Sequence, residues 1–477
     1  MTQTQGGTVT DSDFLEKCPT GIKGLDEITE GGLPRGRPSL VCGGPGCGKT
    51  MLAMEFLVRG ARQYDEPGVF VTFDETARDL AKNFASLQFN LGDLVSRKKI
   101  LLNQSPVKGS EIEVVGQYTL DGLLIGIKHG IDSIGARRLV LDGIESLFSF
   151  LTNESLLRSE LRRLFLWLKE VCVTTVVTGE RGTETLSRHG LEEYIADCVL
   201  LLDHRVTDQI CTRRLRVIKY RGSAHAANES PFLMDRDGIY VFPITSLGLD
   251  HEVSSQRILT GIEKLDVMLE GKGYYSGSSL LVSGSAGTGK SSVAAHFVDA
   301  VCRSGHKGLF VGFEESRSQI LRNMMSIGID LGLWIAKDLL RFHTARPTSH
   351  NLEMHLLTIF RLIEDFQPDI VVMDPISSLT AVGNSSDARA MVTRLIDFMK
   401  MRGITGVYTD LKFGEALFEQ TELGISSVMD VWILLEQVQG SGRRDRTMSI
   451  LKARGIAHSN QIRDFLITNK GVGLQEV

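Results

Sequence analysis

Two segments of this 477-residue chain match the pattern G-x4-G-K-[ST], whose residue types suit the binding of nucleotide phosphates. Glycines let the backbone curl so that several N–H groups face one phosphate, and the helix that follows adds positive potential. The lysine reaches the β- and γ-phosphates, and the hydroxyl after it binds Mg²⁺. Two accidental matches at repeat spacing are implausible, so we expect two ATP sites. The loops are Gly43, Gly44, Pro45, Gly46, Cys47, Gly48, Lys49 and Thr50, and Gly284, Ser285, Ala286, Gly287, Thr288, Gly289, Lys290 and Ser291.

An aspartate ends a short apolar run downstream of each loop, namely Asp142 and Asp374. In a phosphate-loop fold this position carries the second carboxylate of the magnesium shell. A helix N-cap or a solvated turn is the alternative interpretation for either residue alone. Because both stand in register after a phosphate loop, we favour the metal role. Metal ligands are then expected from Thr50 with Asp142 and from Ser291 with Asp374.

Two adjacent carboxylates follow the next strand-like run in each half of the chain. They are Asp74 with Glu75 and Glu314 with Glu315. A carboxylate near the γ-phosphate can orient or deprotonate the attacking water or hydroxyl, although a charged strand end is also common on any surface. Adjacent strand residues point in opposite directions, so one member of each pair is expected to face the nucleotide. Asp74 is one methylene shorter than Glu314, which could slow or re-route the chemistry in the first half.

The landmarks recur in the same order, which indicates two homologous domains in tandem. Lys49 and Lys290, Phe73 and Phe313, Asp142 and Asp374, and Lys219 and Lys452 are offset by 241, 240, 232 and 233 residues. We expect a flexible N-terminus over 1–13, a first domain over 14–247, a linker over 248–256 and a second domain over 257–477.

Short apolar, β-branched runs alternate with helical patterns such as residues 157–172 and 391–400. Near-continuous apolar strands are typical of a sheet that is buried on both faces. The fold class is therefore α/β, with two P-loop domains that each contain a mainly parallel sheet flanked by helices. Residues 213–222 and 446–455 look more exposed, and we expect them to form antiparallel edge pairs.

Composition excludes several classes of protein. With 53 basic and 58 acidic residues the net charge is −5, so no global basic field attracts nucleic acid. No apolar run is long enough to span a membrane, and the first fifteen residues lack a secretory signal, which favours the cytoplasm. Seven cysteines without a CxxC pair suggest reduced thiols. They are Cys18, Cys42, Cys47, Cys172, Cys198, Cys211 and Cys302.

Two P-loop copies, each with an acidic pair and a late K-x-R-G, resemble the KaiC family of RecA-like ATPases. The strings FVTFDET, ERGTETLSRHGLEEYIAD and LGISSVMDVWILL carry the resemblance, which covers about residues 14–475. It implies two tandem RecA-like domains and a homohexamer of two stacked rings, with ATP and Mg²⁺ between neighbouring subunits.

The resemblance also implies basic residues that reach a neighbouring subunit's nucleotide. A cation delivered in this way neutralises transition-state charge and couples hydrolysis to assembly. Taken alone, K-x-R-G would be an exposed basic strand end. The matching positions are Lys219, Arg221, Ser223 and His225 in the first ring, and Lys452, Arg454 and His458 in the second.

The second ring of the family transfers phosphate to hydroxyls near the subunit interface. The acceptors match Ser426 and Ser427 here, where the family usually shows Ser-Thr. Without the alignment, these serines would be a turn or a cap. Glu314 matches the general base, with Glu315 beside it. Thr421 matches an auxiliary hydroxyl, and Arg389 matches a basic residue near the acceptors.

The resemblance therefore predicts an ATPase and serine/threonine autokinase that acts as a circadian-type timing switch. It leaves room for a KaiB-like partner at the first ring. We doubt a KaiA-type activator, because the sequence stops at Val477 without the tail that docks it in the best-known members.

Two other functions remain as alternatives. A RecA-like DNA-dependent ATPase would want basic pore loops and salt-sensitive DNA affinity, which a gel shift at low salt tests. An ATP-binding signalling scaffold would turn over little nucleotide. The acidic pairs weigh against a scaffold, although Asp74 keeps that interpretation open for the first ring.

Overall fold

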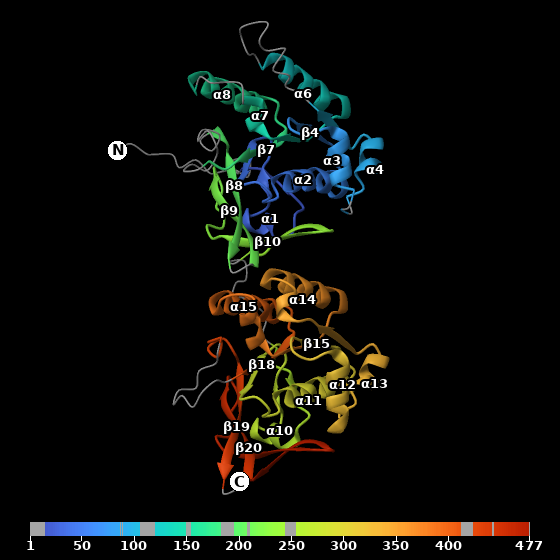
Figure 1. The fold of residues 1–477 in the computed structure, drawn as a ribbon, viewed down its shortest axis with the longest axis vertical. Coiled ribbons are helices and arrows are strands. Elements are labelled where there is room, and N and C mark those ends of the chain that lie inside the picture. The colour runs from blue at the N-terminus through green and yellow to red at the C-terminus, as the bar shows by residue number, and fades with distance from the viewer. Residues whose placement is uncertain are drawn as a thin grey trace, which may run out of the picture. The chain divides into compact units, whose positions relative to one another are not determined.

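The computed structural model divides the chain into two compact units, Met1–Ser246 and Leu247–Val477 (Figure 1). We call them the first and the second unit. The structure describes residues 15–85, 87, 89–104, 120–148, 154–182, 195–207, 210–243, 254–411, 423–440 and 443–476.

A nine-stranded sheet forms the centre of the first unit, in the order β11-β10-β9-β8-β3-β7-β6-β4-β5. The strands from β8 to β5 run parallel, and β9, β10 and β11 continue the sheet as antiparallel neighbours. The strands of this sheet are β3 (Pro38–Gly43), β4 (Gly68–Thr72), β5 (Ile100–Gln104), β6 (Arg138–Asp142), β7 (Thr174–Glu180), β8 (Cys198–Thr207), β9 (Ile210–Tyr220), β10 (Ser230–Asp235) and β11 (Gly238–Val241). A separate two-stranded sheet pairs β1 (Lys17–Cys18) with β2 (Leu33–Pro34).

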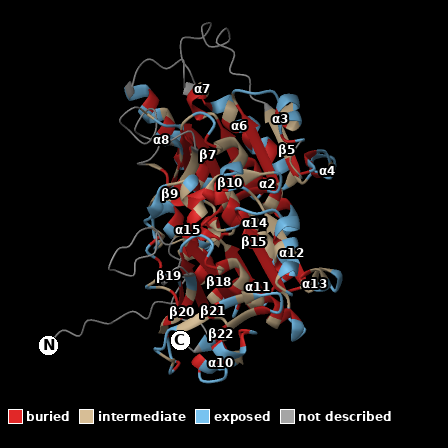
Figure 2. Cartoon of the chain, turned by 60° about the horizontal axis from the view of Figure 1, so that its bottom comes forward, coloured by how far each residue is buried: buried red, intermediate tan, exposed pale blue. Residues whose placement is uncertain are grey.

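Helices cover both faces of this sheet, because alternate strand residues point to opposite sides. Val41 of β3 joins a core with the helix α2, whereas its neighbours Leu40 and Cys42 join a second core with α6 and α8. The central strands are buried along their length (Figure 2). The helices are α1 (Leu25–Ile28), α2 (Lys49–Gln63), α3 (Ala77–Asn83), α4 (Leu91–Ser96), α6 (Asp121–Ile134), α7 (Ile144–Phe148) and α8 (Glu154–Glu170).

The second unit repeats this architecture, with the sheet order β16-β15-β17-β18-β14-β19-β20-β21-β22. Its strands are β12 (Arg257–Ile258), β13 (Tyr274–Tyr275), β14 (Ser279–Gly284), β15 (Gly308–Gly312), β16 (Leu340–Thr344), β17 (Ile370–Asp374), β18 (Thr405–Leu411), β19 (Val431–Gly440), β20 (Arg443–Ala453), β21 (Arg463–Thr468) and β22 (Gly471–Glu476). Its helices are α10 (Glu263–Met268), α11 (Lys290–Arg303), α12 (Arg317–Ser326), α13 (Gly332–Ala336), α14 (Leu352–Phe366) and α15 (Ser385–Met401), with short 3₁₀ helices η2 (Pro347–Ser349) and η3 (Ile376–Ala381).

Two mainly parallel, helix-covered sheets confirm the predicted α/β class. The helical pattern over 391–400 falls in α15, and that over 157–172 falls in α8 except for its last two residues, since α8 ends at Glu170. One expectation was wrong in part. The strands β9 and β20 pair antiparallel as predicted, but neither lies at a sheet edge, because β10 with β11 and β21 with β22 extend the sheets beyond them.

None of the helices in the described ranges has the length and apolar character needed to cross a lipid bilayer.

Candidate functional site

The first phosphate loop joins the end of β3 to the start of α2. Gly46 and Gly48 have φ of 70° and 104°, a region that glycine enters without steric cost. The Lys49 ammonium curls over the loop and donates to the carbonyl oxygens of Gly43 and Gly44 at 2.7 and 3.0 Å. A positive group thus sits over a loop that begins a helix, the arrangement that attracts phosphate.

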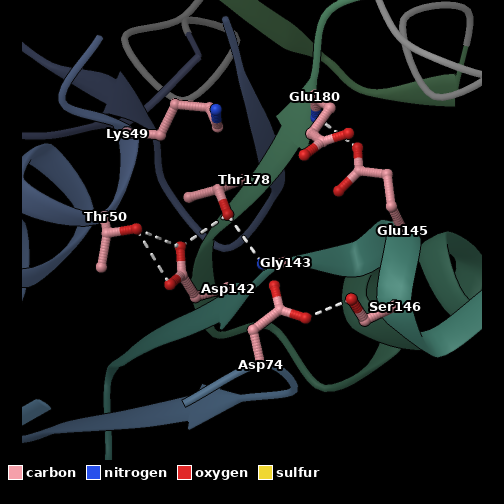
Figure 3. A pocket seen from close by; sticks show the side chains of 9 residues that line it. All are labelled: Lys49, Thr50, Asp74, Asp142, Gly143, Glu145, Ser146, Thr178 and Glu180. Carbon is pink, nitrogen blue, oxygen red and sulfur yellow. Dashed lines mark hydrogen bonds between the residues drawn. The ribbon is translucent and has the colours of Figure 1, made fainter. Parts of the chain in front are cut away.

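Oxygen atoms suited to a divalent cation gather beside this loop (Figure 3). The Thr50 hydroxyl lies 3.2 and 3.1 Å from the two carboxylate oxygens of Asp142. Thr178 on β7 donates to Asp142 Oδ1 at 2.6 Å, and its Oγ1 accepts from the Gly143 N–H at 2.9 Å. Burial raises the pKa of Asp142, against the hydrogen bonds from both threonines. A hydroxyl and a carboxylate are hard oxygen ligands, so this pair fits Mg²⁺.

The first acidic pair separates into two environments. Asp74 lines the cavity beside Lys49 and accepts a hydrogen bond from Ser146 Oγ on α7. Glu75 instead accepts from Asn83 Nδ2 on α3 at 3.1 Å. The structure therefore brings Asp74 to the phosphate loop and turns the Glu75 carboxylate toward α3.

A cavity of about 230 Å³ opens between these groups. Glu145 is 8% exposed and accepts from the Glu180 backbone N–H. In the second unit a serine, Ser377, accepts from the corresponding N–H of Leu411 at 3.4 Å. The first site therefore carries a carboxylate where the second has a hydroxyl. The lining residues are Lys49, Thr50, Asp74, Asp142, Gly143, Glu145, Ser146, Thr178 and Glu180.

The second phosphate loop repeats the first. The Lys290 ammonium donates to the Gly284 and Ser285 carbonyls at 2.9 and 2.8 Å. Burial lowers the pKa of Lys290, and the carboxylates of Asp374, Asp410 and Glu314 act in the opposite sense. The site thus places a buried cation among three acidic groups.

The predicted metal residues of the second unit also lie together. Ser291 and Thr409 both hydrogen-bond the Asp374 carboxylate. Burial raises the pKa of Asp374, and these two hydroxyls lower it. The same hard-oxygen set as in the first unit is therefore present.

The second acidic pair divides in the same manner. Ser378 Oγ on η3 donates to Glu314 Oε1 at 2.8 Å, and Asn323 Nδ2 on α12 donates to Glu315 Oε2 at 3.1 Å. A serine from the 3₁₀ helix after the neighbouring strand β17 thus holds the first carboxylate, and an asparagine from α12 holds the second.

The turn that carries the predicted acceptors Ser426 and Ser427, called the acceptor turn below, lies at the other end of the sheet from the phosphate loop. Asp430 Oδ2 accepts from both the N–H and the hydroxyl of Ser279, each at 2.9 Å, at the start of β14. Lys400 lies 2.7 Å from the same oxygen. The loop begins at Gly284, where β14 ends.

Basic side chains hold the acceptor turn in place. Lys452 Nζ donates to the carbonyls of Ser426 and Ser427 at 3.0 and 3.2 Å, and an Arg454 Nη donates to that of Ser427 at 2.6 Å. Ser426 is half-buried and Ser427 is exposed. Arg389 on α15 packs beside Gly424 in the same segment.

The first unit has a matching cluster at the start of β3. Asp197 lies 2.8 Å from Lys169 Nζ and 3.5 Å from an Arg221 Nη. Lys219 is on the adjoining strand, opposite Val199. The structure therefore separates these basic residues from their own phosphate loop.

Of the remaining predicted positions, Ser223 Oγ donates to the Ala224 carbonyl at 2.8 Å, and His458 Nδ1 lies 3.2 Å from the Ile456 carbonyl. His225 is half-buried, and Thr421 falls outside the described residues.

Two pairs of hydroxyl residues at the sites escaped sequence reasoning. Thr178 and Thr409 hold the metal-site aspartates, and Ser146 and Ser378 hold the first carboxylates. The available signal was repetition, since each serine follows its strand-end aspartate by four residues. Serine and threonine are too common for one occurrence to carry information.

Comparison with known proteins agrees with this duplicated geometry. A family model described as "ATPase: KaiC" matches residues 18–246 and again residues 258–476. The chain belongs to the KaiC family. Circadian clock protein KaiC2 of Synechocystis sp. is 52% identical over 464 residues, 97% of this chain and 82% of that protein. Circadian clock oscillator protein KaiC of Synechococcus elongatus is 36% identical over 467 residues, 97% of this chain and 89% of that protein.

Membership of the KaiC family makes the chain a nucleotide-binding P-loop ATPase with two tandem repeats.

Proposed function

We propose that this KaiC-family ATPase is also a serine autokinase, which transfers the γ-phosphate of ATP in its second unit to Ser426 or Ser427 of a neighbouring subunit. Phosphorylation would make the chain a timing switch in the cytoplasm, a proposal supported by its similarity to circadian clock proteins. The observation that carries the proposal is the position of the acceptor turn at the opposite end of β14 from the phosphate loop.

The length of β14 sets the separation within one chain. Ser279, bonded to Asp430, and Gly284, bonded to Lys290, stand at the two ends of this six-residue strand. At about 3.3 Å per residue, the two ends are about 16 Å apart. In-line transfer needs reacting atoms about 3 to 3.5 Å apart, so a chain cannot phosphorylate its own turn.

A ring of subunits resolves this separation. When the acceptor edge of one subunit meets the loop edge of the next, each site contains a nucleotide and a foreign hydroxyl. The same contact would bring Lys452 and Arg454 of one subunit toward the neighbour's phosphates, where cations stabilise transferring charge. We therefore propose a homohexamer with nucleotide at its interfaces.

The Glu314 carboxylate takes the proton from the acceptor Oγ, and that oxygen forms a bond to the γ-phosphorus. The bond from the γ-phosphorus to the bridging oxygen breaks, and ADP leaves. Lys290 compensates the charge on the phosphates, and Ser291 and Asp374 would hold the Mg²⁺ ion. Bound there, Mg²⁺ would supply neutralisation of developing charge.

Hydrolysis in the first unit uses the same parts with water as the nucleophile. Asp74 lines the cavity beside Lys49 and is placed to orient that water, and Thr50 with Asp142 would hold Mg²⁺. Binding of a KaiB-like partner to this unit remains a proposal from the resemblance alone.

A mixing experiment tests transfer between subunits. Chains with Lys290→Ala lack the donor site, and chains with both Ser426→Ala and Ser427→Ala lack the acceptors. With γ-labelled ATP, each variant alone should stay unlabelled, and the mixture should label the Lys290→Ala chain, distinguished by a size tag. Sizing with and without Mg·ATP shows whether mixed oligomers form. Label on the Lys290→Ala chain when it is incubated without the other variant would contradict the proposal. A wild-type protein that stays unlabelled would contradict it as well.

A further inference from the structure

We propose that Ser146 and Ser378 are positioning residues that aim the reacting carboxylates, Asp74 and Glu314, at the nucleophile in the first and second units. The inference rests on the proposed function, because it assigns a role to the groups that hold its general bases. It adds a residue in each site that neither sequence reasoning nor the comparisons assign.

The same contact occurs in both units of the chain. Ser378 Oγ donates to Glu314 Oε1 at 2.8 Å, and Ser146 Oγ donates to Asp74 Oδ1. Each serine lies in the short helix, α7 or η3, that follows a strand ending in an aspartate. That strand, β6 or β17, pairs with the strand that precedes the carboxylate, β4 or β15. Two copies that differ in the carboxylate, Asp against Glu, keep the same hydroxyl partner.

Each serine selects one member of its acidic pair. The second carboxylates, Glu75 and Glu315, are held by asparagines on α3 and α12. The serine therefore distinguishes the carboxylate that faces the phosphate loop from the one that does not.

The chemistry gives this bond a specific use. An ionised carboxylate is an acceptor with two oxygens, so a donor on one oxygen fixes the rotamer and leaves the other free to take a proton. In the first unit the Asp74 carboxylate occupies the space that a Cβ on Gly143 would fill, since that Cβ would lie 2.1 Å from Oδ2. The serine hydrogen bond restricts where the carboxylate can point, and an error of about 1 Å can cost about 100-fold in rate.

Other hydroxyls of η3 provide a matched control. Thr380 Oγ1 donates to the Ser377 carbonyl at 2.8 Å, and Ser377 Oγ accepts from the Leu411 N–H at 3.4 Å. These contacts hold the turn itself, whereas Ser378 alone of the three bonds the carboxylate in the described part of the chain. A purely structural role for Ser378 would therefore be shared with Thr380.

The test compares Ser378→Ala, Ser378→Thr and Thr380→Ala in the full-length protein. Rates of phosphate incorporation and ATP affinity are measured for each. We expect Ser378→Ala to lose about tenfold or more in rate with ATP affinity within about twofold of wild type. Ser378→Thr keeps the hydroxyl and should restore most of the rate, and Thr380→Ala should resemble wild type. An unchanged rate in Ser378→Ala, or no rescue by threonine, would overturn the inference.

A parallel Glu314→Gln variant distinguishes a failure of the proposed base from a failure of the role inferred for Ser378. If Glu314→Gln transfers phosphate normally, the proposed base is wrong and the inference falls with it. If Glu314→Gln is impaired and Ser378→Ala is not, only the inference fails. The double variant Ser378→Ala with Glu314→Gln should be no slower than Glu314→Gln alone. A hydroxyl that acts only by orienting the Glu314 carboxylate has no further effect once that carboxylate is replaced.

The first unit gives an independent measurement. Ser146→Ala is compared with Ser146→Thr in chains that also carry Lys290→Ala, so that ATP hydrolysis reports the first site. A loss in hydrolysis rate at unchanged ATP affinity, restored by threonine, is expected. Equal ATP hydrolysis rates in Ser146→Ala, Ser146→Thr and the Lys290→Ala parent would overturn the assignment of Ser146.

Discussion

Asn323 Nδ2 donates to Glu315 Oε2 at 3.1 Å, and Asn83 repeats the contact with Glu75 at the same distance in the first unit. The second carboxylate of each acidic pair is thereby tied to the helix that follows it. Two adjacent acidic residues are thus assigned to different neighbours, and their replacement should have different effects.

Glu314→Gln and Glu315→Gln should therefore separate in a kinetic assay. The first removes the proposed proton acceptor and should slow phosphate incorporation by about 100-fold or more, with nucleotide still bound. The second replaces one hydrogen-bond acceptor of Asn323 by another and should change the rate by less than about threefold. Labelling with γ-labelled ATP measures both. Similar losses in the two variants would show that the carboxylates act jointly.

Gly143→Ala should impair ATP hydrolysis in the first unit. Gly143 has φ of 80°, and an added Cβ would lie 2.1 Å from Asp74 Oδ2, so the carboxylate must move. We expect a loss of about tenfold or more in hydrolysis, measured in a Lys290→Ala background. Gly126→Ala on α6 is the control, because its Cβ would meet no atom within 4 Å. Full hydrolysis by Gly143→Ala would show that the Asp74 position is not critical.

The stability of the carboxy-terminal hairpin of β21 and β22 should depend on pH because of His296. Its Nε2 accepts from the Val472 N–H at 2.9 Å, so the imidazole must be neutral there. Burial lowers the pKa of His296 below its usual 6.5, Asp299 raises it, and Arg303 lowers it. Between that lowered pKa and 6.5 the unfolded chain binds more protons, so this contribution is complete above about 6.5 and is lost as pH falls through the folded pKa.

His296→Gln provides the comparison, because its amide oxygen can accept the same bond without titrating. The free energy of unfolding of each full-length protein is measured in urea at pH 7.5 and pH 5.5. Wild type should lose more stability on acidification than the glutamine variant. Equal losses would mean that His296 does not titrate in this range.

Asp430→Asn should loosen the acceptor turn. Burial alone would raise the pKa of Asp430, but hydrogen bonds from Lys400 and Ser279 hold it below its usual value, so the group is an anion that anchors the turn. We expect less label on Ser426 and Ser427 with unchanged ATP binding, and a loss of about 1–3 kcal/mol in stability. Asp197→Asn is the matched variant in the first unit and should leave this labelling intact.

The duplicated α/β fold could be predicted from sequence because its signals are local and repeated. Apolar β-branched runs such as that of β6 predict buried parallel strands, and each phosphate loop marks a strand and the helix after it. Strand order is a long-range property. The expectation that β9 and β20 are edge strands was wrong because the strands that cover them, β10 and β21, carry no motif that announces pairing.

The site was predictable only where a motif fixes the geometry. The pairs Thr50 with Asp142 and Ser291 with Asp374 follow from the phosphate-loop pattern, and the structure places each pair in contact. The partners Thr178, Thr409, Ser146 and Ser378 come from neighbouring strands and turns. Their roles depend on strand order, which no short pattern encodes.

Glu145 and Glu180 give the first pocket two acidic side chains where the second unit has Ser377 and Leu411. Asp410, which acts on Lys290 in the second unit, has Gly179 as its counterpart in the first, so the net surplus of the first pocket is one carboxylate. A polyanion bound beside that extra negative charge needs more counter-charge from cations. As the free magnesium of a cell declines, the first pocket should release its occupant before the second does. The two sites of one chain would then empty at two different concentrations of free magnesium.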